Sequence, residues 1–164
     1  AKLIIKSEST NDETCRQNFL KQLAKVKIDP KRLEILPFTA KNHEHLSLYH
    51  KIDIALDTFP YNGTTTTFEA LWMGVPVFTI AGTAHVSRVS LSILANLKLF
   101  DFIAPSLHNF TEYVLKYTQN LNLLQELRQS LRTKMSSSPL LNAKLFTINL
   151  EKNFYTLWQN WYNS

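Results

Sequence analysis

A glycine and four consecutive threonines stand between an apolar segment and a helix-like run, in the stretch 57–74 that reads DTFPYNGTTTTFEALWMG. A loop that leaves a strand and begins a helix exposes backbone N–H groups and the positive end of the helix dipole. The hydroxyls of Thr64, Thr65, Thr66 and Thr67 add donors next to Gly63. The pattern indicates a phosphate site. The plainer alternative is a threonine-rich N-cap that begins an ordinary amphipathic helix.

A carboxylate follows one turn into the same helix-like run. Glu69 stands where its oxygens could accept hydrogen bonds from sugar hydroxyls. The loop and this carboxylate together predict a ligand that carries both a phosphate and a sugar.

A second group of polar residues follows the apolar segment Leu33–Leu36. The run Thr39-Ala40-Lys41 follows this segment, so the backbone there could meet a base and the lysine could offset phosphate charge. The alternative for Lys41 is a solvated loop lysine. His45 could stack on or bond to a nucleotide, or be a structural or exposed histidine. His43 and His45 would point about 200° apart on a helix, so we expect no metal site here.

A further turn that contains a glycine, Gly82–Arg88, follows the apolar segment Val75–Ile80 and begins another helix. His85 and Arg88 are candidate phosphate or substrate contacts in this turn. The alternative for Arg88 is an ion pair with an acidic surface residue.

The elements that must position these residues alternate between strand and helix. This alternation predicts an α/β fold with a Rossmann-like, doubly wound parallel sheet, in which ligands bind at the carboxyl ends of the strands. The expected strands are 3–6, 33–36, 52–56, 75–80 and 102–103, and the expected helices are 12–26, 42–51, 65–73, 87–97, 109–117, 121–135 and 145–162. We expect a lobe over residues 1–138 and a terminal helical segment over residues 139–164.

Composition narrows the class of protein. The chain has 164 residues, of which 45% are hydrophobic, so a packed core is expected. The net charge of +5 suits a polyanionic ligand, but the basic residues are scattered, which disfavours nucleic acid. No apolar run reaches the roughly 20 residues that cross a bilayer, so we expect no membrane association. A single cysteine, Cys15, excludes an intrachain disulfide, and with no evident export signal this favours a cytoplasmic protein. The opening without methionine suggests a position inside a longer protein.

The ordered series LPFTAKNHEHL and DIALDTFPYNGTTTTFEALWMGVPVFTIAGTAHVSRVSLSIL resembles the C-terminal catalytic lobe of the O-linked N-acetylglucosamine transferase family and its fucose-transferring SPINDLY relatives. The resemblance runs from about Arg32 to the end. It implies the second Rossmann-like half of a GT-B glycosyltransferase, which holds most of the nucleotide sugar. The implied reaction is metal-independent, inverting transfer to Ser or Thr hydroxyls of proteins.

The resemblance also implies roles for the residues that match. Lys41 and the backbone near Thr39 would meet the base, and His45 would pack against the nucleoside. Thr65 and Thr66 would bind the diphosphate, and Glu69 would hold the ribose hydroxyls. Thr64, the NHEH run and the TTTTFEAL run lean toward the fucosyl relatives, whereas Ser87-Arg88-Val89 leans toward the acetylglucosamine enzymes. The donor stays open between a UDP and a GDP sugar.

The resemblance places the partner lobe, a lysine near the leaving group and acceptor-selecting helical repeats upstream of this chain. We name no catalytic base, and we expect a donor-binding lobe with little or no transferase activity alone. The alternative is a non-catalytic nucleotide-sensing or protein-interaction module derived from such a lobe.

The terminal helix carries an apolar stripe at helical spacing. We expect most of the stripe to pack on the lobe's own core, with part of it free to face a missing lobe or to promote self-association. The stripe comprises Phe146, Leu150, Phe154, Leu157, Trp158 and Trp161.

Overall fold

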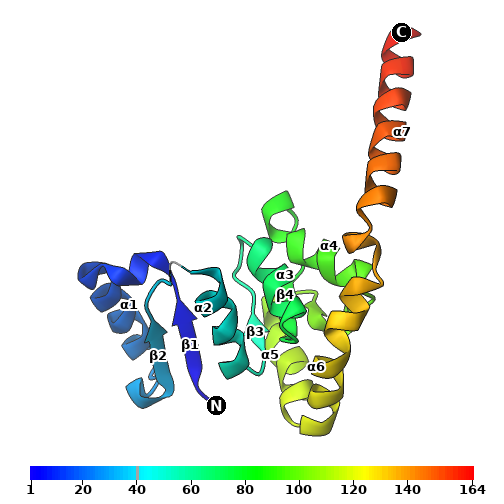
Figure 1. Ribbon diagram of the computed structural model, residues 1–164. Helices are drawn as coiled ribbons and strands as arrows, with labels where there is room; N and C mark the ends of the chain where they lie inside the picture. The colour runs from blue at the N-terminus through cyan, green and yellow to red at the C-terminus, as the bar shows by residue number, and fades with distance from the viewer. Residues whose placement is uncertain (40) are drawn as a thin grey trace. The chain divides into compact units, whose positions relative to one another are not determined.

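The computed structural model describes residues 1–39 and 41–164 (Figure 1). It divides the chain into two compact units, Ala1–Ile52 and Asp53–Ser164. The structure therefore separates the chain much earlier than the expected division at residue 138, and each unit is considered by itself below.

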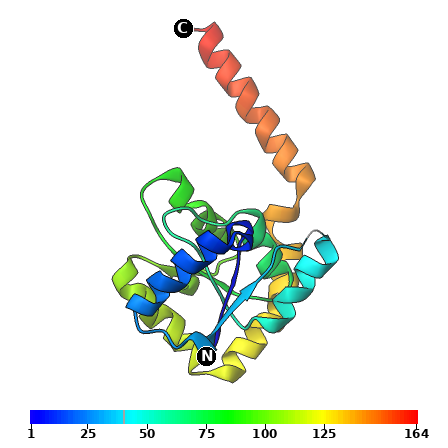
Figure 2. The same cartoon turned by 90° about the vertical axis from the view of Figure 1, so that its left-hand side faces the viewer.

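The first unit contains a pair of parallel strands, β1 (Leu3–Lys6) and β2 (Leu33–Leu36), seen side by side in Figure 2. Both strands begin and end as the sequence predicts, and Lys6 is in register with Leu36 at their carboxyl ends. Two 3₁₀ turns flank helix α1 in the connection between these strands: η1 (Glu8–Asn11) precedes the helix and η2 (Pro30–Arg32) follows it.

Two helices complete the first unit. Helix α1 (Glu13–Lys25) begins where Asp12 accepts a hydrogen bond of 2.8 Å from the Cys15 N–H. That backbone hydrogen bond lowers the pKa of Asp12, and the neighbouring carboxylate raises the pKa of the exposed Cys15 thiol. The expected helix 42–51 is shorter than predicted: α2 (Asn42–Ser47) gives way to the 3₁₀ turn η3 (Leu48–Lys51).

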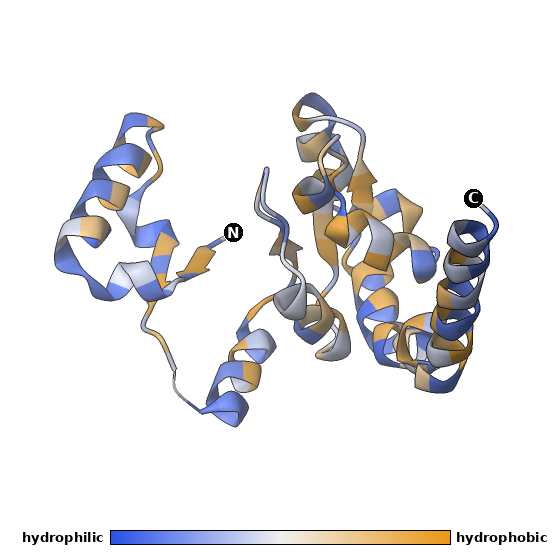
Figure 3. Ribbon diagram, turned by 90° about the horizontal axis from the view of Figure 1, so that it is seen from above, coloured by the Kyte–Doolittle hydropathy of each residue, from blue (hydrophilic) through white to orange (hydrophobic). Residues whose placement is uncertain are grey.

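The second unit is built on a three-stranded parallel sheet with the order β3-β4-β5. The strands are β3 (Ala55–Leu56), β4 (Val77–Ile80) and β5 (Ile103–Ala104). The central strand β4 is buried along its whole length, because helices α3, α4 and α5 pack against it. Figure 3 shows the corresponding concentration of hydrophobic residues in the strands of this unit.

The helices of the second unit are close to those expected. They are α3 (Thr65–Trp72), α4 (Val89–Asn96), α5 (Leu107–Thr118), α6 (Leu121–Ser136) and α7 (Ala143–Tyr162), with 3₁₀ turns η4 (His85–Ser87), η5 (Phe100–Phe102) and η6 (Pro139–Leu141).

The end of α3 is held in two ways. Gly74 adopts a left-handed φ of 76°, which lets its N–H reach the Leu71 carbonyl and the Val75 N–H reach the Ala70 carbonyl, as in a Schellman motif. From α6, the Arg132 Nε donates a hydrogen bond of 2.9 Å to the Trp72 carbonyl. Helix α3 is therefore fixed to α6 at its carboxyl end.

Helix α7 differs from the expectation for the terminal segment. Every one of its residues is exposed, including Phe154, Trp158 and Trp161 of the apolar stripe (Figure 1). Within this unit the helix contacts η6, at its own start. The stripe is thus uncovered by the described residues, and packing on the lobe's core is not observed.

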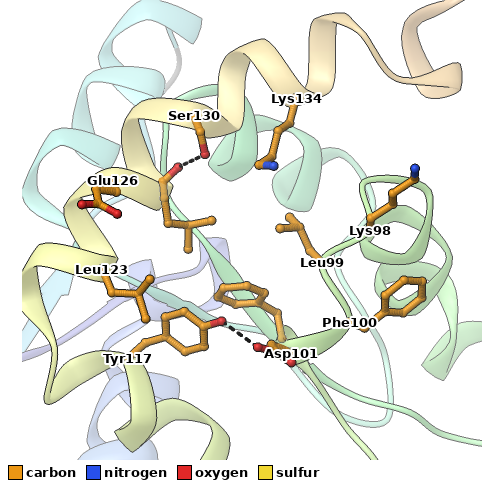
Figure 4. Close-up of a pocket in the computed structure, with 11 residues that line it drawn as sticks. Lys98, Leu99, Phe100, Asp101, Tyr117, Leu123, Glu126, Ser130 and Lys134 are labelled. Carbon is orange, nitrogen blue, oxygen red and sulfur yellow. Dashed lines mark hydrogen bonds between the residues drawn. The ribbon is translucent and has the colours of Figure 1, made fainter.

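An aromatic cluster fills the core beside β4. The ring centroids of Phe78 and Phe102 lie 4.9 Å apart, and those of Phe102 and Tyr117 lie 4.6 Å apart. The Tyr117 hydroxyl donates to Asp101 at 3.1 Å (Figure 4). Lys116 pairs with the same carboxylate at 3.0 Å. Burial, followed by the hydrogen bond to Asp101, raises the pKa of Tyr117 to about 12.

Tyr117 borders a hollow of about 550 Å³ between η5 and α6 (Figure 4). The turn η5 immediately precedes β5, so the hollow lies toward the amino ends of the strands. It is therefore separate from the carboxyl-end loops in which the sequence predicts a ligand. Its lining includes Leu99, Phe102, Tyr117, Leu123, Leu127 and Lys134.

The raised pKa of Tyr117 gives a testable pH dependence. Because the folded-state pKa lies above the ordinary tyrosine value near 10, its contribution to stability should be complete below pH 10 and should be lost as pH rises toward 12. The phenolate absorbance of each protein is measured as a function of pH, and the curve of Tyr117→Phe is subtracted from that of the wild type. The difference should show one transition near pH 12. In Asp101→Asn the transition should move down only part of the way, since burial is the larger cause. A wild-type transition at the ordinary value would contradict this assignment.

Candidate functional site

Asp57, the first residue after β3, holds the threonine loop against the sheet. Its Oδ1 accepts a hydrogen bond of 2.8 Å from the Gly63 N–H, and its Oδ2 accepts one of 2.7 Å from the hydroxyl of Thr79, a buried residue of β4. One carboxylate thus joins the loop to the central strand. Sequence reasoning missed this role, although an aspartate directly after a strand and before a glycine loop was a usable signal.

The Gly63 carbonyl is anchored as firmly as its N–H. It accepts hydrogen bonds from the hydroxyls of Thr67 (3.0 Å) and Ser90 (3.1 Å), both of which are buried. A Cβ at position 63 would lie 2.5 Å from the Thr66 Oγ1, so the close approach of the loop to α3 requires glycine. Both peptide groups that flank this Cα are therefore fixed in orientation.

The beginning of α3 is open. Thr64, Thr65 and Thr66 are exposed, and Thr64, at the N-cap position, makes no side-chain capping hydrogen bond. Among the residues that the structure describes, nothing accepts a hydrogen bond from the N–H groups of Thr64 or Thr65. The helix therefore presents amides and the positive end of its dipole without the threonine cap of the plainer alternative. Glu69 lies half-exposed, one turn further along.

A second loop lies beside the threonine loop at the carboxyl end of β4. The Asn62 N–H donates a hydrogen bond of 2.9 Å to the Val86 carbonyl, which joins the two loops. The Arg88 guanidinium donates to the Gly82 carbonyl at 2.9 Å rather than to a carboxylate, and both it and His85 are exposed. The structure therefore brings these two predicted residues to the same sheet edge as the threonines, within the second unit.

Asn62, next to Gly63 in the threonine loop, was not singled out from the sequence. Its side chain is buried, and its Nδ2 donates to the Thr58 carbonyl at 3.0 Å. Within the described part of the chain its Oδ1 has no hydrogen-bond partner. A buried acceptor directly before the phosphate-binding candidate Gly63 is unusual, because most buried polar atoms are paired.

In the first unit, Lys6 brings together two of the predicted residues. Its Nζ lies 2.7 Å from the Thr39 Oγ1 and 2.6 Å from the His45 Nδ1, at the carboxyl ends of β1 and β2. The His45 ring also makes an edge contact with Tyr49, with centroids 5.6 Å apart. Sequence reasoning missed Lys6, which reads as the last residue of an apolar strand.

Lys41 lies apart from this contact. Its ammonium is exposed and forms an ion pair of 3.5 Å with Glu44, in the first turn of α2. Ala40, whose backbone was included in the predicted base contact, lies outside the described residues. No group of three metal-ligating side chains occurs among the residues described, and none of their helices is long and apolar enough to cross a membrane.

Comparison with known proteins gives a consistent result. The sequence matches glycosyl transferase family 41 over residues 12–150. A probable UDP-N-acetylglucosamine--peptide N-acetylglucosaminyltransferase SPINDLY of Oryza sativa subsp. japonica is 38% identical over 161 residues, which are 98% of this chain and 17% of the rice protein. A probable UDP-N-acetylglucosamine--peptide N-acetylglucosaminyltransferase SEC of Arabidopsis thaliana is 32% identical over 120 residues. These are 73% of this chain and 12% of the Arabidopsis protein.

A solved structure agrees with the sequence matches. A mutant O-GlcNAc transferase from Thermobaculum terrenum superposes with a TM-score of 0.90 and 31% identity, over 98% of this chain and 31% of that chain. This likeness confirms the expected α/β fold of one GT-B half. The chain belongs to glycosyl transferase family 41.

The clamp made by Asp57 predicts a measurable loss of stability. In Asp57→Ala the buried Thr79 hydroxyl and the Gly63 N–H lose their acceptor, which should lower the free energy of unfolding by about 1–3 kcal/mol. Asp57→Asn keeps one oxygen acceptor and should lose less. Urea denaturation followed by circular dichroism measures both.

The matched control is Asp53→Ala, because Asp53 is exposed and lies just before the same strand. It should change the free energy of unfolding by no more than about 0.5 kcal/mol. Equal losses for the two alanine variants would show that Asp57 is not a clamp.

Proposed function

We propose that this chain is the nucleotide-sugar-binding part of an inverting protein O-glycosyltransferase, with a UDP-N-acetylglucosamine or GDP-fucose donor and Ser or Thr hydroxyls as acceptors. The observation that carries the proposal is the open start of α3, where the Thr64 and Thr65 amides have no acceptor among the described residues. Membership of family 41 supports the reaction class, and the names of the plant relatives, which describe peptide N-acetylglucosaminyltransferases, support a peptide acceptor.

The chemistry follows from the geometry of this helix start. During sugar transfer, negative charge develops on the departing diphosphate. Amides that are already oriented stabilise that charge without reorganising. In this proposal the amides and hydroxyls of Thr64, Thr65 and Thr66 serve this purpose, with Arg88 and His85 beside them. The anchored Gly63 keeps the amides in place before the ligand arrives.

The remaining predicted residues bind the rest of the donor in this proposal. Glu69 holds the ribose hydroxyls, while Thr39, Lys41 and His45 serve the base and nucleoside. The chain spans 17% of the rice relative and 31% of the solved transferase. We therefore propose that it does not transfer sugar alone, and that acceptor selection and the catalytic base belong to other parts of a longer protein. No metal takes part in this scheme.

Calorimetric titration with UDP and with GDP tests the donor-binding proposal. One of the two should bind with a micromolar-to-millimolar dissociation constant. Glu69→Ala should weaken that binding by about tenfold, the equivalent of about 1.4 kcal/mol, because a carboxylate that bonds two hydroxyls is lost.

Glu112→Ala is the control, since Glu112 is an exposed carboxylate on α5. It should bind as wild type does. Folded protein that binds neither nucleotide would refute the proposal. Equal effects of the two alanine variants would remove Glu69 from the site.

We further propose that the isolated chain self-associates through α7. Leu150, Phe154, Leu157 and Trp161 follow one another at helical spacing on a helix that no described residue covers. Burying such a face in a second copy removes apolar surface from water.

Phe154→Ser combined with Trp161→Ser should leave a monomer in sedimentation velocity at a concentration where wild type is a dimer. Lys152→Ser combined with Gln159→Ser, which removes exposed polar side chains of the same helix, should stay dimeric. Monomeric wild type at every concentration would disprove self-association.

A further inference from the structure

Lys6 is a cation that neither the predicted site nor the comparisons assign to a role. It is the last residue of β1, so it lies at the carboxyl edge of the parallel strand pair, the edge at which α/β folds bind ligands. Its side chain is partly buried, and its ammonium lies 5.8 Å from the centroid of the Phe38 ring. The charge is therefore held in a defined position rather than left in solvent.

The partners of this ammonium do not balance its charge. Two of its three N–H groups point to the Thr39 hydroxyl and the His45 ring nitrogen. Within the described part of the chain no carboxylate lies within ion-pair distance of Lys6, and its third N–H has no acceptor. Lys41 and Lys116, by contrast, each pair with a carboxylate although both are exposed.

The contact with His45 also fixes where the imidazole carries its proton. A lysine ammonium donates and cannot accept, so the His45 Nδ1 must supply a lone pair at 2.6 Å. An uncharged imidazole then carries its hydrogen on Nε2. Lys6 therefore sets the hydrogen-bonding direction of the Nδ1 in a residue expected to contact the nucleoside.

We propose that Lys6 is a further donor-binding residue. Its ammonium orients Thr39 and holds His45 in the Nε2–H form, and its third N–H donates to an oxygen of the nucleoside portion of the donor. This inference rests on the proposed function, because it deepens the same site. It adds a residue that the resemblance does not name.

The first test needs no nucleotide. In ¹H–¹⁵N spectra of the chain labelled in histidine, at mildly alkaline pH, His45 should be the Nε2–H form, with its signals assigned from the His45→Gln variant. Lys6→Met should convert it to a mixture of both forms, and Lys6→Arg, which keeps a donor, should preserve it. Lys2→Met is the control, because Lys2 is exposed and lies outside β1. An Nδ1–H form in wild type, or no change in Lys6→Met, would overturn the inference.

The second test measures ligand affinity. For whichever nucleoside diphosphate wild type binds, Lys6→Met should weaken binding by about tenfold, as expected for the loss of a charge-assisted hydrogen bond. The matching nucleoside, titrated by NMR, should lose affinity by the same factor, and Lys2→Met should bind as wild type. Far-ultraviolet circular dichroism checks that each variant is folded. If Lys6→Met does not fold, Lys6→Gln, which removes the positive charge but keeps a polar side chain, gives the same comparison.

The outcomes separate the two proposals. Wild-type affinity in Lys6→Met would overturn the inference and leave the donor-binding proposal standing. A loss with the diphosphate but none with the nucleoside would overturn the assignment to the nucleoside portion. If the wild type binds no nucleotide, the donor-binding proposal and the ligand contact of Lys6 are both refuted. If the His45 result is nevertheless as expected, the role of Lys6 in orienting His45 stands.

Discussion

The orientation of the two peptide groups that flank the Gly63 Cα governs what the second unit presents to a ligand. The Gly63 N–H is bonded to the Asp57 carboxylate, and the Gly63 carbonyl is bonded to the hydroxyls of Thr67 and Ser90. With both sides engaged by buried or half-buried groups, the chain must enter α3 in one direction. The amides that follow are then directed outward, and no threonine side chain is needed to cap them. A catalytic site that stabilises charge benefits from this arrangement, because its dipoles are aligned before charge develops.

The two units use the same architectural device with different chemistry. In each, polar residues follow parallel strands at their carboxyl ends, where the backbone leaves the sheet. In the second unit the donors are amides and hydroxyls at a helix start. In the first unit the donor is a single ammonium, that of Lys6, which contacts Thr39 and His45. Family 41 membership gives both arrangements a common purpose in our proposal, the binding of a nucleotide sugar.

Much of the fold could be predicted because the local signals agree with the tertiary structure. The strands Leu3–Lys6 and Leu33–Leu36 begin and end as expected, and the start of α3 follows the glycine–threonine pattern. The exposed positions of Thr64 and Thr65 agree with the expectation, but ligand binding by them stays a prediction. Lys6 was missed because its partners Thr39 and His45 lie 33 and 39 residues away. Asp57 was missed because its bond to Thr79 spans 22 residues, although its other partner, Gly63, is six residues away. The burial of α7 was overestimated, since an apolar stripe shows that a helix has a face to cover but not what covers it.

The hydrogen bond from Arg132 to the last turn of α3 has an electrostatic consequence for the opposite end. A guanidinium beside the Trp72 carbonyl offsets the negative pole of a helix only eight residues long. The two poles of so short a helix would otherwise largely cancel at a distance. With one pole neutralised, the field of α3 acts more nearly as a single positive charge, which reaches further into solvent and is more sensitive to ionic strength. Arg132, which contacts the opposite end of α3 from the threonines, thereby contributes to the long-range attraction of anions.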